Sequence, residues 1–470
     1  MGVCASLSDD MIKNNLIDQE LKKRNEEEAK EKTVLAFGAG ESGKTTIFNN
    51  LEYLSNQQRN NPNKTRFIAV LRSNVNESIN RLLAEAKRRK FPVEEDDVDA
   101  TNAIETLSQH HIETRGATIQ KDLSLETAKL IVHLWNTERI KKTFQLKTEF
   151  WLPDNVPYYI INAERIASMD ADADPSDTSA FPTYEDVLAA RSRTGGVVKT
   201  QVKTEEQVWN LVDVGGQRTE RTKWFEAFDS RVNVVLYVVP VGGFAKPIFE
   251  DNKTNSLRES LNTFEKLLQD HLRMLQKIPI ILIFNKCDIL RQDLLHGVNI
   301  AKMFNRYVAT GAESREEDEK SMSRSKQSVD KLYDMDNTPT FRYTDIPEFE
   351  GKSNTESEFC NFLFGLFCAR IPTGITTWQL TYKRISAWST IDVNYIFQEI
   401  RKEVNAWESA PDTKLDTASG KTKGASHADT RSVKEQTLLV PNGIKPEHSR
   451  KERSVTYVAP KTRNNAAKIT

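Results

Sequence analysis

Residues 33–45 decide the fold, because they read Thr-Val-Leu-Ala-Phe and then Gly-Ala-Gly-Glu-Ser-Gly-Lys-Thr. The first five form an apolar run of strand length, the next eight satisfy the pattern G-x-x-x-x-G-K-[ST], and a helical sequence begins at Thr46. A loop of this kind wraps closely around phosphates, with backbone N–H groups and the helix N-terminus facing them. Lys44 is expected to reach the β- and γ-phosphates, and the Thr45 hydroxyl to bind Mg²⁺. The predicted phosphate-binding residues are Gly38, Gly40, Glu41, Ser42, Gly43, Lys44, Thr45 and Thr46.

A second apolar strand, predicted over 208–212, ends in Asp213-Val-Gly-Gly-Gln217. An aspartate at the end of a buried strand suits binding of the same Mg²⁺, directly or through water. The Gly216 N–H is predicted to approach the γ-phosphate, and the Gln217 side chain to orient an attacking water. These residues predict phosphate hydrolysis at the ends of two neighbouring strands.

A third motif identifies the base. The continuous apolar run 278–284, expected for a parallel strand covered on both faces, ends in Asn285-Lys286-Cys-Asp288. The Asp288 carboxylate accepts hydrogen bonds from guanine N1 and N2, where adenine has no matching donor pair. Further along the chain, the Ala387 N–H is a candidate donor to guanine O6. The three motifs in this order predict GTP as the ligand and argue against a P-loop ATPase or small-molecule kinase.

Length and composition bound the architecture. The 470 residues suggest two or three domains, and 169 residues separate Lys44 from Asp213 (213 − 44), which is enough for a whole domain. Much of 63–150 carries helical patterning, so we interpret the gap as an inserted all-α domain. The net charge of −1 argues against a nucleic-acid partner held by bulk charge, and the four cysteines favour a reducing compartment over a disulfide scaffold.

The N-terminus carries a lipidation pattern. The sequence Met-Gly-Val-Cys-Ala-Ser exposes Gly2 for N-myristoylation, and Cys4 offers a second site for palmitoylation. Residues 1–32 hold six Lys/Arg and eight Asp/Glu, so the second membrane signal is not polybasic. An unmodified terminus is the alternative. The amphipathic helix predicted over 9–32 is open to two interpretations, a solvated surface helix or a partner-binding helix.

Three polar stretches lie outside these elements. They are a loop at 168–180, a charged insertion at 310–340 and a tail at 411–470. The tail contains 12 Lys/Arg and 6 Asp/Glu without sustained periodicity, which predicts a disordered basic segment.

Taken together, the motifs resemble the α subunits of heterotrimeric G proteins. The family pattern G-A-G-E-S-G-K-[ST] is met at 38–45, D-V-L-x-x-R-x-x-T-x-G at 186–196, and D-V-G-G-Q-R-x-E-R-x-K-W at 213–224. Residues 255–260, Asn-Ser-Leu-Arg-Glu-Ser, also match. The resemblance is good over 1–62 and 183–305, moderate over 346–405, and patchy in the helical domain.

The resemblance implies an α/β fold, in which a Ras-like P-loop GTPase domain with a doubly wound, mostly parallel sheet carries an inserted all-α domain. It also implies a GTP-driven signalling switch that hydrolyses GTP to GDP and phosphate. The implied domains are an acylated N-terminal helix at 1–32, the GTPase domain at 33–62 and 183–408 with a polar insertion at about 308–345, the helical domain at 63–182, and the tail at 409–470.

Individual roles follow from the same resemblance. Arg191 would be an arginine finger supplied in cis and paired with Glu41, and Thr194 would be the second side-chain ligand of Mg²⁺. Gln217 would place the water. The implied partners are a βγ dimer, a seven-helix membrane receptor, an effector and the inner leaflet of the plasma membrane at its cytoplasmic face, with no nucleic acid.

Three departures from the family pattern stand in or near the site. The guanine loop, T-C-A-T in the family, ends here in Trp388, a Gly195 replaces the usual threonine after Thr194, and Asn162 replaces an aspartate. The tail also has no cysteine. Trp388, Gly195 and the long tail motivate an alternative, a non-cycling, membrane-tethered guanine-nucleotide-binding scaffold. The residues that favour a cycling enzyme are Lys44, Arg191, Thr194 and Gln217.

Overall fold

The computed structural model describes residues 31–55, 64–94, 98, 101–102, 123–174, 176–204, 207–228, 231–276, 278–309, 346–372, 379–409 and 456–458. The predicted lipidation sites Gly2 and Cys4, nearly all of the helix predicted over 9–32, the insertion at 310–340 and most of the tail lie outside these residues. In the described part of the chain, no helix is both long and apolar enough to cross a membrane.

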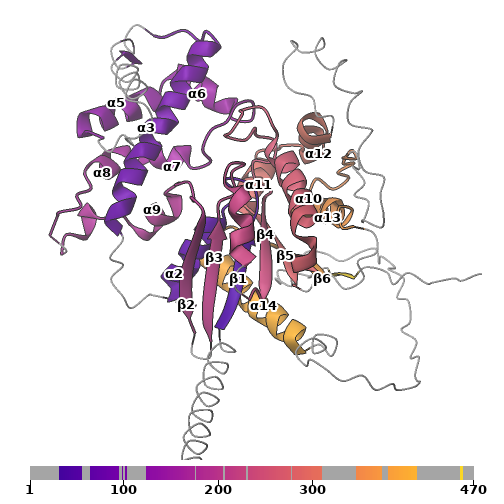
Figure 1. Ribbon diagram of the computed structural model, residues 1–470. Coiled ribbons are helices and arrows are strands. Elements are labelled where there is room, and N and C mark those ends of the chain that lie inside the picture. The colour runs from indigo at the N-terminus through magenta and orange to yellow at the C-terminus, as the bar shows by residue number, and fades with distance from the viewer. Residues whose placement is uncertain are drawn as a thin grey trace, which may run out of the picture.

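A seven-stranded sheet forms the centre of the larger domain, in the order β2-β3-β1-β4-β5-β6-β7 (Figure 1). The five inner strands run parallel, whereas the edge strands β2 and β7 are antiparallel to their neighbours. This confirms the predicted mostly parallel sheet. The strands are β1 (Glu31–Phe37), β2 (Val197–Lys203), β3 (Val208–Val214), β4 (Val234–Pro240), β5 (Ile280–Asn285), β6 (Gln379–Arg384) and β7 (Thr456–Val458).

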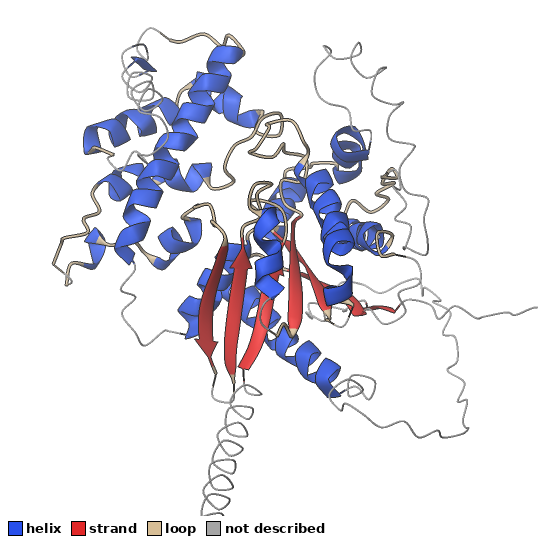
Figure 2. Cartoon of the chain, in the orientation of Figure 1, coloured by secondary structure: helices blue, strands red, loops and turns tan. Residues whose placement is uncertain are grey.

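Helices cover both faces of this sheet (Figure 2). Alternate residues of β1 face opposite layers, because side chains alternate along a strand. Leu35 and Phe37 pack in the layer of α10 and α13, whereas Val34 and Ala36 pack in the layer of α2 and α14. The helices of this domain are α2 (Lys44–Ser55), α10 (Ser256–Leu275), α11 (Cys287–Leu295), α12 (Ile300–Phe304), α13 (Glu356–Cys368) and α14 (Thr390–Ser409), with a 3₁₀ segment at Arg221–Phe228 and a π-helical turn at Asn305–Ala309.

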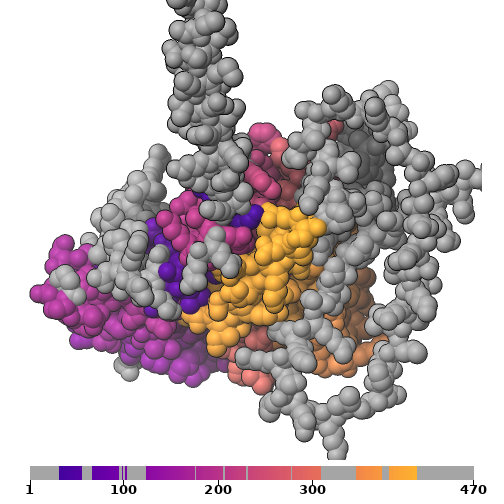
Figure 3. Space-filling model, turned by 90° about the horizontal axis from the view of Figure 1, so that it is seen from below, coloured from indigo at the N-terminus to yellow at the C-terminus, as the bar shows by residue number. Residues whose placement is uncertain are grey.

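The topology places the phosphate loop at the middle of the sheet. Strand β1 lies between β3 and β4, so the loop that follows it opens at the carboxyl ends of three adjacent parallel strands. The end of β5, with the N-K-x-D motif, lies one strand further along. Seen from below, α14 lies at the surface of the domain with α2 beside it (Figure 3).

The inserted residues form a separate helical body (Figure 1). Helix α3 shows why: Val75, Ile79 and Leu82 recur at helical spacing, and all three are fully buried. The hydrophobic cluster of this body continues to Val187 and Ala189, so helical packing extends beyond residue 182, where we predicted the domain to end. Its helices are α3 (Lys64–Arg88), α5 (Leu125–Trp135), α6 (Glu138–Gln145), α7 (Val156–Ile161), α8 (Ala163–Ala167) and α9 (Tyr184–Ala189), with a 3₁₀ turn at Thr178–Ala180.

The first strand differs from the prediction in its start. We predicted helix through residue 32, but β1 begins at Glu31. Lys32 is buried in the sheet because its ammonium pairs with Glu408 at 2.8 Å, a contact with α14 that no local pattern reveals. At the opposite edge, residues 456–458 of the predicted tail pair with β6.

Candidate functional site

The loop between β1 and α2 turns tightly around a cavity. Two of its glycines have positive φ, +144° at Gly38 and +100° at Gly43. A Cβ atom on Gly38 would collide with the carbonyl oxygen of Val238, and one on Gly43 with the amide of Asn285. Strand β4 and the N-K-x-D motif therefore close directly on the loop, and only glycine fits at these two points.

Lys44 lies under this loop. It is 5% exposed, and its ammonium donates to the carbonyl oxygens of Gly38 (3.0 Å) and Ala39 (2.9 Å) and to Ser42 Oγ (3.3 Å). Burial lowers the pKa of Lys44 to about 8, although nearby Asp213 acts in the opposite direction. The loop thus holds a cation whose charge is poorly neutralised by the protein, which suits it to an anionic ligand.

Three oxygen-bearing side chains meet beside Lys44. Thr45 Oγ1 lies 2.5 Å from Asp213 Oδ2 and 2.8 Å from Thr194 Oγ1, and Thr194 Oγ1 lies 3.2 Å from the same carboxylate oxygen. Burial raises the pKa of Asp213, and its Oδ1 has no hydrogen-bond partner among the described residues. Hydroxyl and carboxylate oxygens are ligands that Mg²⁺ prefers, and a buried unpartnered oxygen is costly without one. These residues therefore fit a magnesium ion.

Arg191 follows α9 and points back over the phosphate loop. Its guanidinium bonds Glu41 Oε1 at 2.5 Å and Glu77 Oε2 at 2.9 Å, and its Cζ lies 4.7 Å from the centre of the Trp151 ring. Burial alone would lower the pKa of Arg191, but the two glutamates raise it above its ordinary value. The predicted pairing with Glu41 is present, and Glu77 is a second partner that we did not predict.

The backbone of Arg191 is fixed by the helical domain. Asn74 of α3 accepts a hydrogen bond from the Arg191 N–H at 2.8 Å and donates one to its carbonyl oxygen at 3.0 Å. Asn74 is itself buried. The position of this arginine therefore depends on α3.

Gln217 also lines the cavity. A Cβ atom placed on Gly40 would come within 3.4 Å of Gln217 Cγ and 3.3 Å of Glu250 Oε1, so this wall of the cavity touches the phosphate loop. The backbone of Gly216 approaches even more closely, because a Cβ there would collide with Lys44 Nζ. The glycine pair before Gln217 thus allows the close approach expected from the sequence.

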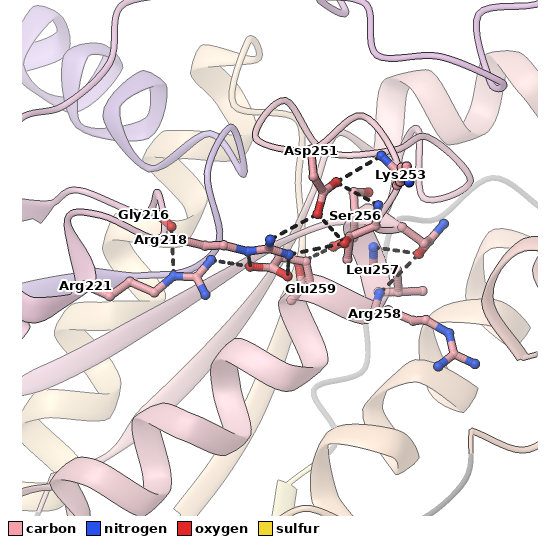
Figure 4. Close-up of polar contacts among 12 residues, drawn as sticks. Gly216, Arg218, Arg221, Asp251, Lys253, Ser256, Leu257, Arg258 and Glu259 are labelled. Atoms are coloured by element: carbon pink, nitrogen blue, oxygen red, sulfur yellow. Dashed lines mark hydrogen bonds and ion pairs between the residues drawn. The ribbon is translucent and has the colours of Figure 1, made fainter. Parts of the chain in front are cut away.

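The segment after Gly216 is tied to α10 (Figure 4). Arg221 donates to the Gly216 carbonyl oxygen at 3.2 Å and to Glu259 at 2.6 Å, and Arg218 donates to the same glutamate at 2.8 Å. Arg218 also pairs with Asp251 at 3.0 Å. Burial alone would raise the pKa of Glu259, but the two arginines lower it. A buried glutamate of α10 therefore fixes the segment that carries Gln217.

Asn285 connects the base motif to the phosphate loop. Its amide donates to the Ser42 carbonyl oxygen at 2.9 Å, and its Oδ1 accepts the Ala387 N–H at 2.9 Å. We expected the Ala387 N–H to face guanine O6, but in this structure it bonds Asn285 and so holds the guanine loop against the N-K-x-D motif. Lys286, with φ +65°, turns the chain into α11, and Asp288 lies in the first turn of that helix.

The cavity between these walls has a volume of about 350 Å³. Nearly all of the predicted site residues line it. The two exceptions lie behind the lining, where Gly38 accepts a hydrogen bond from Lys44 and Asp213 accepts one from Thr45. The predicted residues that line it are Gly40, Glu41, Ser42, Gly43, Lys44, Thr45, Thr46, Arg191, Thr194, Gly216, Gln217, Asn285, Lys286, Asp288 and Ala387.

Comparison with known proteins agrees with this geometry. The profile of the G-protein alpha subunit family matches residues 12–404. The chain belongs to this family. It is 30% identical over 312 residues to the guanine nucleotide-binding protein alpha-2 subunit of Dictyostelium discoideum, which is 65% of this chain and 82% of that one. It is 30% identical to the alpha-1 subunit of Pisum sativum (67% and 84% covered) and 31% identical to the alpha-1 subunit of Mycosarcoma maydis (63% and 79%).

Membership of this family makes the chain a GTP-binding signalling subunit and a GTPase. The predicted family, fold class and enzyme class are therefore confirmed. Of two departures from the family pattern, the structure explains one. Nothing among the described residues requires glycine at 195, since a side chain there would meet none of their atoms within 4 Å. Asn162 bonds the Tyr158 carbonyl oxygen and Arg165, and so joins α7 to α8.

Asp154 of the helical domain reaches across to the GTPase domain of this Gα chain. Its carboxylate pairs with Lys246 Nζ at 2.5 Å and with Lys286 Nζ at 2.6 Å. Burial alone would raise the pKa of Asp154, but the two lysines hold it well below its usual range. One carboxylate thus bridges the helical domain, the loop before α10 and the base motif.

Trp151 makes a second contact between the domains. Its backbone N–H donates to Asn252 Oδ1 at 2.5 Å, its indole N–H donates to Glu41 at 3.0 Å, and its ring meets Phe249 edge-on at 4.7 Å. The same ring supports the guanidinium of Arg191. Trp151 therefore supports Glu41 and Arg191, two residues that line the cavity.

Sequence reasoning missed Glu77, Trp151, Asp154 and Lys246, since their roles arise from contacts between distant segments. Glu259 had a usable signal, because it lies inside the matching segment 255–260.

Proposed function

We propose that this Gα subunit is a cycling switch, bound to GDP with a βγ dimer, bound to GTP with an effector, and reset by hydrolysis. The observation that carries the proposal is the convergence of the phosphate loop with Arg191, Thr194 and Gln217 on one cavity, with Asp213 directly behind Thr45 and Thr194. A scaffold that never hydrolyses GTP has no need for Arg191, which acts in the transition state, or for Gln217, which orients the attacking water.

In this proposal the attacking group is water. Its oxygen bonds to the γ-phosphorus while the bond from phosphorus to the bridging oxygen of GDP breaks, which gives GDP and inorganic phosphate. Gln217 orients the water by hydrogen bonding. Arg191 leaves Glu41 to stabilise charge on the phosphoryl oxygens in the transition state, and Lys44 remains under the β- and γ-phosphates.

Thr45, Thr194 and Asp213 would hold Mg²⁺. A bound magnesium ion supplies positive charge that offsets the negative charge of the β- and γ-phosphates. Thr194 and the Gly216 N–H sense the γ-phosphate, so its loss releases the segment that Arg221 ties to α10.

The test is single-turnover GTP hydrolysis with Mg²⁺, comparing wild type with Gln217→Leu. We expect hydrolysis to slow by about 100-fold or more, with GTP binding retained. Gln269→Leu is the matched control, because Gln269 is an exposed glutamine on α10. Equal rates in wild type and Gln217→Leu would favour the scaffold alternative.

The membrane part of the proposal rests on the N-terminal sequence. Myristate on Gly2 and palmitate on Cys4 would anchor the chain at the cytoplasmic face of the plasma membrane, near a seven-helix receptor, since two acyl chains are needed for stable anchoring. Gly2→Ala is expected to move the protein into the soluble fraction of cells. Unchanged membrane association would refute the myristoyl anchor.

A further inference from the structure

Trp388, at the end of the guanine loop, contacts both domains. It lines the cavity beside Ala387 and packs against the hydrophobic cluster of the helical domain. Its ring meets the ring of Tyr158 in α7 edge-on, with the ring centres 5.6 Å apart and the planes at 77°. The family pattern has a small threonine in place of this tryptophan, and a threonine has no ring to meet Tyr158.

The tyrosine side of this ring pair is rigid. The Tyr158 hydroxyl donates to Asp186 Oδ1 at 2.7 Å, and Asp186 is fully buried. Arg165 holds the same carboxylate at 2.7 Å, and Thr183 donates its backbone N–H to it at 2.7 Å. If Trp388 moves, Tyr158 therefore cannot move with it without breaking its hydrogen bond to Asp186.

The tryptophan side is equally fixed. The Ala387 carbonyl oxygen accepts a hydrogen bond from buried Asn50 of α2 at 3.0 Å, and the Ala387 N–H is held by Asn285. The Ser386 N–H donates to Asp392 in the first turn of α14 at 2.9 Å. Two rigid supports, one in each domain, thus present the two rings to one another.

We propose that Trp388 and Tyr158 form a gate over the base end of the cavity, and that this gate slows the release of guanine nucleotide. The proposal rests on the placement of the base against Asp288. A base that leaves this end passes between the guanine loop and α7, so the rings must separate. An edge-on aromatic pair resists that separation in addition to the apolar area it buries.

The experiment follows release of a fluorescent GDP analogue from the full chain with Mg²⁺. Trp388→Thr is expected to speed release about three- to tenfold, and Trp388→Phe, which keeps a ring, to stay close to wild type. The chemical step in single-turnover GTP hydrolysis should change by less than about twofold, because the substitution leaves in place Arg191 and Gln217, which act at the γ-phosphate. A parallel loss of hydrolysis would indicate general damage and overturn the gate.

Tyr158→Leu separates a gate from a simple base contact. It should speed release as Trp388→Thr does, and the double variant should be no faster than the faster single variant, because both substitutions remove the same contact. Release unchanged in Tyr158→Leu, or fully additive effects, would overturn the proposal. Trp135→Thr is the matched control, since Trp135 meets Phe144 edge-on at 5.0 Å inside the helical domain, and it should leave release unchanged.

The placement of the base is tested separately. Asp288→Ala should weaken binding of the GDP analogue at least about tenfold, since it leaves the donors of guanine unpaired. Undiminished affinity would show that the base lies elsewhere, which would overturn both the placement and the gate. Weakened binding in Asp288→Ala with release unchanged in Trp388→Thr would overturn the gate alone.

Discussion

Replacing Asp154 by asparagine removes the negative charge that Lys246 and Lys286 share. The three side chains are 12% to 19% exposed, so their ion pairs lie between two limits. Exposed pairs contribute up to about 1 kcal/mol, and breaking a fully buried pair costs about 3–5 kcal/mol. We therefore expect Asp154→Asn to cost the closed arrangement of the two domains about 2 kcal/mol of stabilisation. If the open arrangement is unaffected, this loss makes GDP release about 30-fold faster.

The assay is stopped-flow release of a fluorescent GDP analogue at constant Mg²⁺ and salt. Glu85→Gln is the control, because Glu85 also pairs with two bases, Arg88 and Arg89, but both lie at the end of α3 in the same domain. It should lower the stability of the helical domain without speeding release. If Asp154→Asn released GDP at the wild-type rate, or no faster than Glu85→Gln, the reasoning would be refuted. Lys246→Met should speed release in the wild type and have no further effect in Asp154→Asn.

Three other substitutions test the site and the domains that support it. Gly40→Val should slow single-turnover hydrolysis about 100-fold while GDP still binds, because the valine side chain would displace Gln217. An unchanged rate would argue against Gln217 as the residue that positions the water. Glu259→Gln should lower the free energy of unfolding by about 1.5–3 kcal/mol in denaturant titration, and no loss would mean that its ion pairs are dispensable. Burial alone would raise the pKa of Asp186, but Arg165 and the Tyr158 hydroxyl lower it below its ordinary value. Ionised Asp186 therefore stabilises the fold above its unfolded pKa of about 4, and this stabilisation is lost as the pH falls from there through the folded pKa. The melting temperature of Asp186→Asn should therefore fall less than that of the wild type between pH 5 and pH 3. Parallel curves of melting temperature against pH for the two proteins would contradict this.

The fold was predictable wherever a motif and an element coincide. The apolar runs at 33–37, 208–212 and 278–284 are each followed at once by a motif with a chemical task, so the sequence predicts strand, loop and function together. The start of β1 could not be predicted from the sequence, because Lys32 is charged and its partner Glu408 lies 376 residues away.

The walls of the cavity were only partly predictable, for the same reason. Arg191 and Glu41 were paired through the family resemblance, but nothing near Trp151 or Asp154 in the sequence indicates a contact with the other domain. The Ala387 N–H was assigned to the base, whereas a side chain 102 residues away accepts it. Such contacts depend on how separate segments pack, which local periodicity does not encode.

The double hydrogen bond between Asn74 and Arg191 has a kinetic consequence. Any movement that carries α3 away from the phosphate loop withdraws the arginine as well, because the asparagine holds its backbone at both the N–H and the carbonyl oxygen. If the proposed cycle exchanges nucleotide through such a movement, the open arrangement is unable to hydrolyse it. Exchange and hydrolysis would then be mutually exclusive in time, so a newly bound GTP would not be consumed until the molecule had closed around it.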